Sequence, residues 1–207
     1  MIGVAAGMVA ASLAGIGIAA AATLGVSSGD VWAGTQALTK GTCVVTGSTA
    51  TWVDEKNPTR AQSGDLEVES RKNRDRWAFA SFDLSSCRLP ATGGADRATL
   101  TLKLSSAPRQ SRTLTLTPVL TPWNTSLTWN GAQPLVYGSP TTTFASGTNN
   151  GATFALDVTA AVDALIRDPS SSHGWRIDDK GGSSNRSALA FAASGGGQPT
   201  LTIDWEK

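Results

Sequence analysis

The segment at residues 70–77, SRKNRDRW, holds the main local concentration of charged side chains that could bind a ligand. Four of its residues are basic: Arg71, Lys72, Arg74 and Arg76. Guanidinium groups form bidentate pairs with planar carboxylates, such as those of uronic acids in an acidic glycan. The segment could therefore be a basic rim for an anionic polymer, or a solvated hairpin whose charges maintain solubility. We treat the four residues as candidate ligand-binding residues.

Aromatic side chains follow this basic segment. Trp77 and Phe79 alternate with Ala78, Ala80 and Phe82, and alternate residues of a strand point to opposite faces. If the second set faces the core, Trp77 and Phe79 lie on the other face, where sugar C–H groups could rest on them. A loop or a helix covering this face is the alternative. Trp77 and Phe79 are the candidate sugar-contact residues.

An acidic cluster precedes the basic segment. Asp54, Glu55 and Asp65 could hold a structural Ca²⁺ together with backbone carbonyls, because carboxylate and carbonyl oxygens are its usual ligands. No calcium motif of fixed spacing is present. Calcium is thus a possible cofactor of this segment, and no other cofactor is expected.

Catalytic chemistry has little support in the sequence. Glu67 and Glu69 share one strand face about 6–7 Å apart, and glycoside hydrolysis uses two carboxyl groups. A solvated strand face explains the same pattern. His173 and Tyr137 are the sole histidine and tyrosine, and neither a nucleophile elbow nor a metalloprotease motif occurs. We expect a protein that is not an enzyme.

Strands must position these side chains, because apolar and polar residues alternate along most of the chain. ATLTLKL places Leu100, Leu102 and Leu104 on one face, and PTLTIDW places Leu201 and Ile203 likewise. Such alternation indicates antiparallel sheets with one buried face. The chain has 22 Gly and 9 Pro but only 16% charged residues, which fits a β protein. We predict an all-β antiparallel β-sandwich (jelly roll) with one short helix.

The expected helix lies in DVTAAVDALIRDP, residues 157–169. Its apolar residues fall at i, i+4, i+7 and i+8: Val158, Val162, Leu165 and Ile166. Asp157 or Thr159 can cap its N-terminus, and Pro169 prevents its continuation. We expect two to three turns packed over one end or edge of the sandwich.

The N-terminal segment indicates export. Residues 2–26 carry no charge and could span a bilayer of about 30 Å. VWA at 31–33 suits a signal peptidase, so we expect cleavage after Ala33, with an uncleaved anchor as the alternative. The predicted organisation is a signal peptide or membrane anchor at 1–33 and a β-jelly-roll domain at 34–207, extracellular or at the cell surface.

Two cysteines and a small net charge complete this picture. An even cysteine count in an exported chain favours a disulfide between Cys43 and Cys87, which would contribute about 4 kcal/mol. The formal net charge of +1 gives no overall attraction to nucleic acid. Membrane contact is expected only through the N-terminal segment, if that segment is retained.

Several tryptophans have two possible roles. Trp123 and Trp129 in PWNTSLTWNGAQP could form a ligand platform or anchor a long connection to the sheet, and the surrounding strand pattern favours anchors. Trp175 and Trp205 share strand parity with Ile177 and Ile203, which predicts burial. Trp52 fits either role.

An ordered set of segments runs through the chain: NPTRAQSGDLEV, RWAFASFDLS, ATLTLKL, PWNTSLTWNGAQP, FALDVTAAVDALI, HGWRI and FAASGGGQPTLTIDW. Over about residues 43–206 this order resembles DNRLRE domains, also classified as carbohydrate-binding module family 96. The resemblance implies a β-jelly-roll module of secreted or cell-surface proteins that binds polysaccharides, including acidic ones such as alginate. Ser81 departs from the basic residue that members often carry there.

We therefore expect a non-catalytic carbohydrate-binding module whose partner is a polysaccharide. A structural or assembly protein of the cell surface, with the same fold and no sugar ligand, is the alternative.

Overall fold

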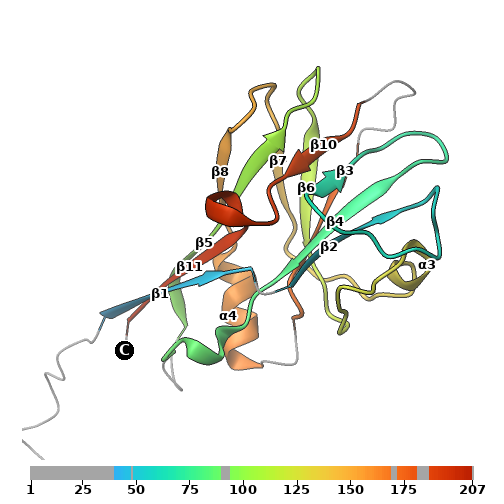
Figure 1. Cartoon of the computed structure of the whole chain (residues 1–207). Helices are drawn as coiled ribbons and strands as arrows, with labels where there is room; N and C mark the ends of the chain where they lie inside the picture. Colours follow the sequence, from blue (N-terminus) through green and yellow to red (C-terminus); the bar gives the residue numbers. More distant parts are fainter. Residues whose placement is uncertain (1–39, 48, 90–93, 169–171, 181–186, 207) are drawn as a thin grey trace, which may run out of the picture. The chain divides into compact units, whose positions relative to one another are not determined.

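Two antiparallel β-sheets pack against one another in the computed structural model of this chain (Figure 1). The structure describes residues 40–47, 49–89, 94–168, 172–180 and 187–206, which belong to a compact unit, Thr39–Lys207. The predicted signal peptide or anchor at 1–33 and the boundary after Ala33 lie outside the described residues. Within the described part of the chain, no helix has the length and apolar character needed to cross a membrane.

The first sheet has six strands in the order β1-β11-β5-β10-β3, with β8 paired to β5 as well. Its strands are β1 (Lys40–Thr46), β3 (Leu66–Val68), β5 (Ala95–Ser106), β8 (Thr153–Asp157), β10 (Leu189–Phe191) and β11 (Thr200–Glu206). The long strand β5 pairs with β11 through residues 95–101 and with β10 through residues 104–106. The first and last strands, β1 and β11, are direct neighbours, with Lys40 opposite Glu206.

The second sheet has five strands in the order β2-β4-β9-β6-β7. They are β2 (Thr49–Asp54), β4 (Arg76–Ser81), β6 (Thr113–Pro118), β7 (Thr142–Ala145) and β9 (Trp175–Asp179). Short helical turns occur at η2 (Leu84–Ser86), α3 (Trp129–Ala132) and η3 (Gly195–Gly197). The predicted all-β antiparallel sandwich is confirmed.

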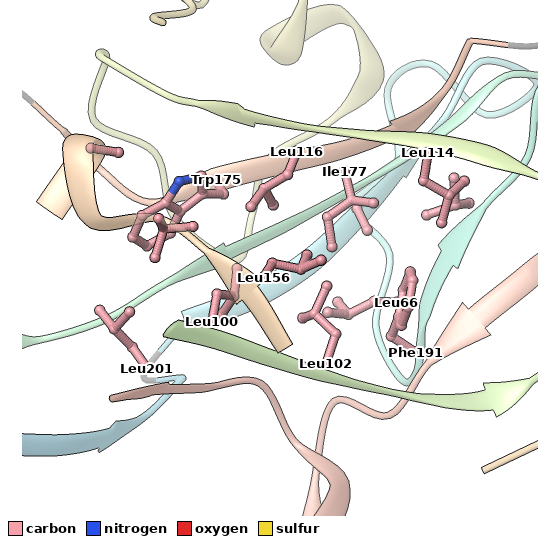
Figure 2. Packing of buried hydrophobic residues seen from close by; sticks show 14 of the residues in the cluster. Leu66, Leu100, Leu102, Leu114, Leu116, Leu156, Trp175, Ile177, Phe191 and Leu201 are labelled. Atoms are coloured by element: carbon pink, nitrogen blue, oxygen red, sulfur yellow. The ribbon is translucent and has the colours of Figure 1, made fainter. Parts of the chain in front are cut away.

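Alternate residues of both sheets form the core between them (Figure 2). Leu100, Leu102 and Leu201 come from the six-stranded sheet, and Leu116 and Ile177 come from the five-stranded sheet. Each has at most 1% of its surface exposed. The predicted core parity therefore holds on both sheets, because one face of each strand is removed from water.

Trp175 and Trp205 differ in burial although both have core parity. Trp175 is 2% exposed and lies in the core, whereas Trp205 is half-buried near the end of β11. Burial was predicted for both, and it is complete only for Trp175.

The predicted helix is α4 (Thr159–Arg167). Its residues Ala161 and Val162 are buried in the core. Asp157 Oδ1 accepts hydrogen bonds from the N–H and the hydroxyl of Thr159. In turn, Thr159 Oγ1 accepts a hydrogen bond from the Ala98 N–H of β5. Neither predicted residue is the N-cap, which is Val158 and makes no side-chain cap hydrogen bond, but Asp157 and Thr159 join the helix start to the six-stranded sheet. Pro169 lies outside the described residues.

Candidate functional site

The outer face of the five-stranded sheet carries the side chains best suited to ligand binding. Strand β4 contributes Trp77 and Phe79, and β9 beside it contributes Arg176 and Asp178. The register places Phe79 opposite Arg176, and it places Thr115 of β6 opposite Asp178. Because Ala78 and Ile177 face the core, these five residues lie on the face turned away from it.

The connection between β6 and β7 covers part of this face. Its residues Val119, Leu127 and Ala132 form a second apolar cluster with Val53 and Phe79. Phe79 has no exposed surface. The prediction that Phe79 contacts sugar is therefore wrong, although its strand parity was predicted correctly, because apolar side chains distant in sequence lie over it.

Trp123 and Trp129 anchor this connection. The ring centroid of Trp123 lies 5.6 Å from that of Phe79, and its Nε1 donates a hydrogen bond to the His173 carbonyl. The ring centroid of Trp129 lies 4.4 Å from that of Trp77. Aromatic pairs at these separations stabilise packing beyond their buried area. The predicted anchoring role is thus seen in the contacts.

Arg176 lies between two aromatic rings beside this covered region. The central carbon of its guanidinium group is 4.5 Å from the ring centroid of Trp77 and 4.1 Å from that of Tyr137. The Tyr137 hydroxyl donates to the Ala132 carbonyl, which fixes its ring. The cation is within contact distance of both π-systems, which favours one orientation of the guanidinium. Trp77 remains half-buried within this stack.

Unused hydrogen-bonding groups surround Arg176. Its Nη2 is 2.5 Å from Asp178 Oδ2, whereas Asp178 Oδ1, Arg176 Nε and Thr115 Oγ1 are buried without a partner among the described residues. Asp178 is 7% exposed and Thr115 has no exposed surface. Buried polar groups are normally hydrogen-bonded. These atoms lie below the surface of the sheet face, so they are unsatisfied polar groups of the fold and not contacts that a sugar on the surface can reach.

The protonation of Asp178 should affect stability. Burial raises the pKa of Asp178, while the charges of Arg176 and Lys180 oppose that increase. A raised folded-state pKa gives stability that is fully present below the unfolded pKa and lost as pH rises through the folded pKa. The free energy of unfolding of Asp178→Asn, relative to that of wild type, should therefore increase as the pH rises from about 3 to about 7. Urea denaturation at a series of pH values measures this difference.

Asp157 provides the matched control for this pH dependence. The hydroxyl and the N–H of Thr159 lower the pKa of Asp157 by hydrogen bonding, so Asp157→Asn should lose stability relative to wild type over the same interval. Parallel pH profiles for the two variants would contradict the opposite shifts.

The basic segment forms the hairpin Ser70–Asp75 between β3 and β4. Arg71 and Lys72 are exposed, and Asp75 accepts a hydrogen bond from the Arg71 N–H. Arg74 is partly exposed, and its Nε lies 3.5 Å from Glu69 Oε2. The hairpin leads directly into the strand that carries Trp77. It therefore adds cations to the stretch of β4 that holds the Arg176 stack.

Arg76 has a different environment from the other three basic residues. Its side chain is 12% exposed, forms a short ion pair with Glu67, and lies within 3.8 Å of Glu69 and Asp54 carboxylate oxygens. The prediction of a ligand-binding Arg76 is therefore wrong, because carboxylates neutralise it inside the fold. Glu69 is 4% exposed, so the interpretation of a solvated strand face is wrong for Glu69, whereas the Glu67 side chain is 33% exposed.

Trp52 belongs to the same buried region. The Arg76 guanidinium lies 5.2 Å from the ring centroid of Trp52, and Trp52 Nε1 donates to the Ser63 carbonyl. Trp52 is 8% exposed and lies in the main core. Of its two possible roles, the structural one is therefore correct.

The structure does not assemble the predicted acidic metal cluster. Asp54 accepts hydrogen bonds from Lys56 and Asn57. Glu55 accepts from the N–H of Asp75, and Asp65 accepts from the N–H of Ala193. Among the residues that the structure describes, no group of three or more His, Cys, Asp or Glu could hold a metal ion. Calcium binding by this protein stays a prediction.

The predicted disulfide is present. Cys43 of β1 is bonded to Cys87, which follows η2, with a Cα–Cα distance of 5.7 Å. It links the edge of the six-stranded sheet to the segment that leaves β4.

Thr115, Tyr137 and Asp178 could not be identified as site residues from the sequence, from which Arg176, Lys180 and Arg186 are expected to add to a basic face only if their strands lie near the hairpin. The alternation in HGWRIDD could have placed Arg176 and Asp178 on the face opposite Trp175 and Ile177. The neighbouring strand could not have been identified, because β4 and β9 pair across about a hundred residues of sequence. Lys180 directly follows β9, and Arg186 lies outside the described residues.

The fold is that of an all-β antiparallel sandwich, with an arginine in contact with two aromatic rings on an outer sheet face. The family model of carbohydrate-binding module family 96 matches residues 42–204, which is most of the chain. The chain therefore belongs to carbohydrate-binding module family 96. No curated protein matches this sequence.

Proposed function

We propose that this module binds an acidic polysaccharide outside the cell and catalyses no reaction. The observation that carries the proposal is the exposed pair Arg71 and Lys72, on the hairpin that leads into the strand of the half-buried Trp77. A uronic acid offers a planar carboxylate, which pairs well with an exposed guanidinium such as that of Arg71.

The exposed cations of the hairpin can attract such a polymer. Arg71 and Lys72 act on an anionic chain over a Debye length of about 8 Å at physiological ionic strength. Electrostatic attraction of this kind weakens as salt increases, which gives the proposal a measurable property.

Two observations support a non-catalytic, exported role. Glu67 and Glu69, the carboxylate pair considered for hydrolysis, both contact Arg76 within the fold. Disulfides persist mainly in oxidising compartments, so the Cys43–Cys87 bond agrees with export.

Binding to a soluble polyuronate, measured by calorimetry with the full chain, tests this proposal. We expect saturable binding to alginate that weakens with added NaCl. The double variant Arg71→Ala, Lys72→Ala should bind about tenfold or more weakly, a loss of about 1.4 kcal/mol. Both side chains are exposed, so the melting temperature should not change.

Arg97→Ala is the matched control for this experiment. Arg97 is an exposed arginine on β5 of the other sheet, and its removal changes the net charge without touching the proposed site. Equal weakening by Arg97→Ala would show that binding follows overall charge and would contradict the site. No saturable binding to any polyuronate would favour a structural role at the cell surface instead.

A further inference from the structure

A cavity of about 660 Å³ opens at one end of the sandwich, away from the Arg176 stack. It lies between α4, the segment Ser81–Leu89 and the residues that lead into β9. Its volume falls in the range of about 300–1,000 Å³ that is usual for small-molecule sites. The proposed polysaccharide site does not use this cavity.

Apolar side chains form most of the cavity wall. Leu84 and Leu89 line it from the segment after β4, and Leu165 and Ile166 line it from α4. The indoles of Trp123 and Trp175 lie among the lining residues as well. Small-molecule sites are typically apolar with a few convergent polar groups, and sugar rings offer C–H faces that pack on indoles.

The polar groups of the cavity include an unsatisfied hydroxyl. Ser172 is 8% exposed, and its Oγ has no hydrogen-bond partner among the described residues. A buried hydroxyl without a partner is costly, so a ligand or water that reached it would gain a hydrogen bond at little desolvation cost. His173 beside it is held by its backbone, since its N–H donates to the Val119 carbonyl and its carbonyl accepts from Trp123 Nε1.

The cavity is built into the fold at two points. Gly174 has φ of +97°, and a Cβ there would lie 2.2 Å from the Ala80 carbonyl oxygen, so only glycine allows β9 to begin this close to β4. The Cys43–Cys87 bond ties the wall that contains Leu84 to β1. A preformed site lowers the entropy cost of ordering it when a ligand binds.

The charge of the cavity differs from that of the outer sheet face. Neither lysine nor arginine occurs among the described residues that line it. The carboxylate of Asp83, its one acidic group, already accepts a hydrogen bond from the Ser85 N–H. A uronate would find no cation here, whereas a neutral sugar would meet hydroxyl and imidazole groups together with apolar walls.

We propose that this cavity binds a neutral sugar unit that carries an apolar substituent, such as a 6-deoxy methyl or an N-acetyl group. The inference rests on membership of a carbohydrate-binding family and is independent of the proposed binding of acidic polymers.

Amide and indole NMR spectra of the ¹⁵N-labelled full chain, titrated with methyl α-L-rhamnopyranoside and with N-acetylglucosamine, test the proposal. We expect saturable shifts at Ser85, His173 and the Trp123 indole for at least one sugar, with a Kd on the order of 1 mM. Sodium glucuronate should cause no shifts there. Absence of shifts with both neutral sugars, or shifts at Trp77 and Arg176 instead, would overturn the proposal.

Ser172→Ala separates a ligand-binding role from a structural one. Because the hydroxyl has no partner in the described part of the chain, its removal should leave the melting temperature unchanged or raise it, while the sugar Kd increases about fivefold or more. Affinity within twofold of wild type would contradict the assignment of this hydroxyl to the ligand.

A tryptophan at the cavity mouth provides a second variant with a close control. Ser85→Trp should fill the cavity and abolish binding, whereas Ser86→Trp, at an exposed neighbour outside the lining, should retain it. The double variant Arg71→Ala, Lys72→Ala should retain neutral-sugar binding while losing polyuronate binding. Loss of both activities in that variant would show that the two ligands share one site.

Discussion

Replacement of Arg76 with alanine is expected to lower the free energy of unfolding by about 3–5 kcal/mol. The substitution would leave Glu69 and Asp54, whose side chains are 4% and 3% exposed, as buried carboxylates without their shared cation. It would also remove the contact between the guanidinium and the Trp52 ring. Urea denaturation at neutral pH measures this loss.

Arg74→Ala is the informative comparison for Arg76→Ala. Arg74 contacts the same Glu69 oxygen at the same 3.5 Å, but 37% of its side chain is exposed. Exposed ion pairs contribute about 0–1 kcal/mol, so this variant should remain close to wild type in stability. Similar losses in both variants would show that burial does not determine the role of Arg76. If Arg74→Ala keeps its stability, any loss of ligand binding in that variant can be assigned to the hairpin and not to unfolding.

Removal of the disulfide by Cys43→Ala together with Cys87→Ala should lower the free energy of unfolding by about 4 kcal/mol. The two cysteines are 44 residues apart, and cross-linking a loop of this length restricts the unfolded chain by about that amount in the chain-entropy model. The double variant should show the change as a lower urea midpoint.

Reduction of the wild-type protein provides the control for the disulfide variant. Dithiothreitol should shift the wild-type midpoint toward that of the double variant and leave the double variant itself unchanged. A loss below about 1 kcal/mol would mean that residual structure already restricts the unfolded chain, or that the bond strains the folded state.

The strands and the helix could be predicted because their signals are local. Alternation placed Leu100, Leu102 and Ile177 on the buried face, and the four-residue spacing of Val158 and Val162 placed them on one face of a helix. These patterns depend only on the geometry of the element that contains them. Burial of Trp205 was predicted by the same rule and is incomplete, because strand parity does not reveal where the opposing sheet ends.

The candidate site depends on contacts between distant residues, so the sequence predicted only part of it. Parity placed Phe79 on the outer face correctly, but its burial depends on Val119 and Leu127, some forty residues later. The four basic residues of the segment 70–77 cannot be distinguished by their sequence context. Only the fold distinguishes Arg76, which contacts three carboxylates, from the exposed Arg71.

The cavity at the end of the sandwich is a stronger example of the same limit. Leu84, Leu165 and Ser172 come from three separate segments, and none has an unusual local pattern. Their convergence follows from the strand order and from the position of α4, which links to β5 through Thr159. No pattern within a single segment could have predicted that these residues line one cavity.

The pairing of β1 with β11 determines how this module responds to mechanical tension. Lys40 and Glu206 are opposite one another, so a force that pulls the two chain ends apart loads the first residue pair and peels β1 from β11 pair by pair. The fourth pair contains Cys43, which is covalently bonded to Cys87. The bond keeps force on β1 from passing beyond Cys43 into residues 44–86, so further extension must separate β11 from β1 and β5. Since the unfolding rate governs resistance to force, this contribution of the disulfide is one that equilibrium denaturation does not report.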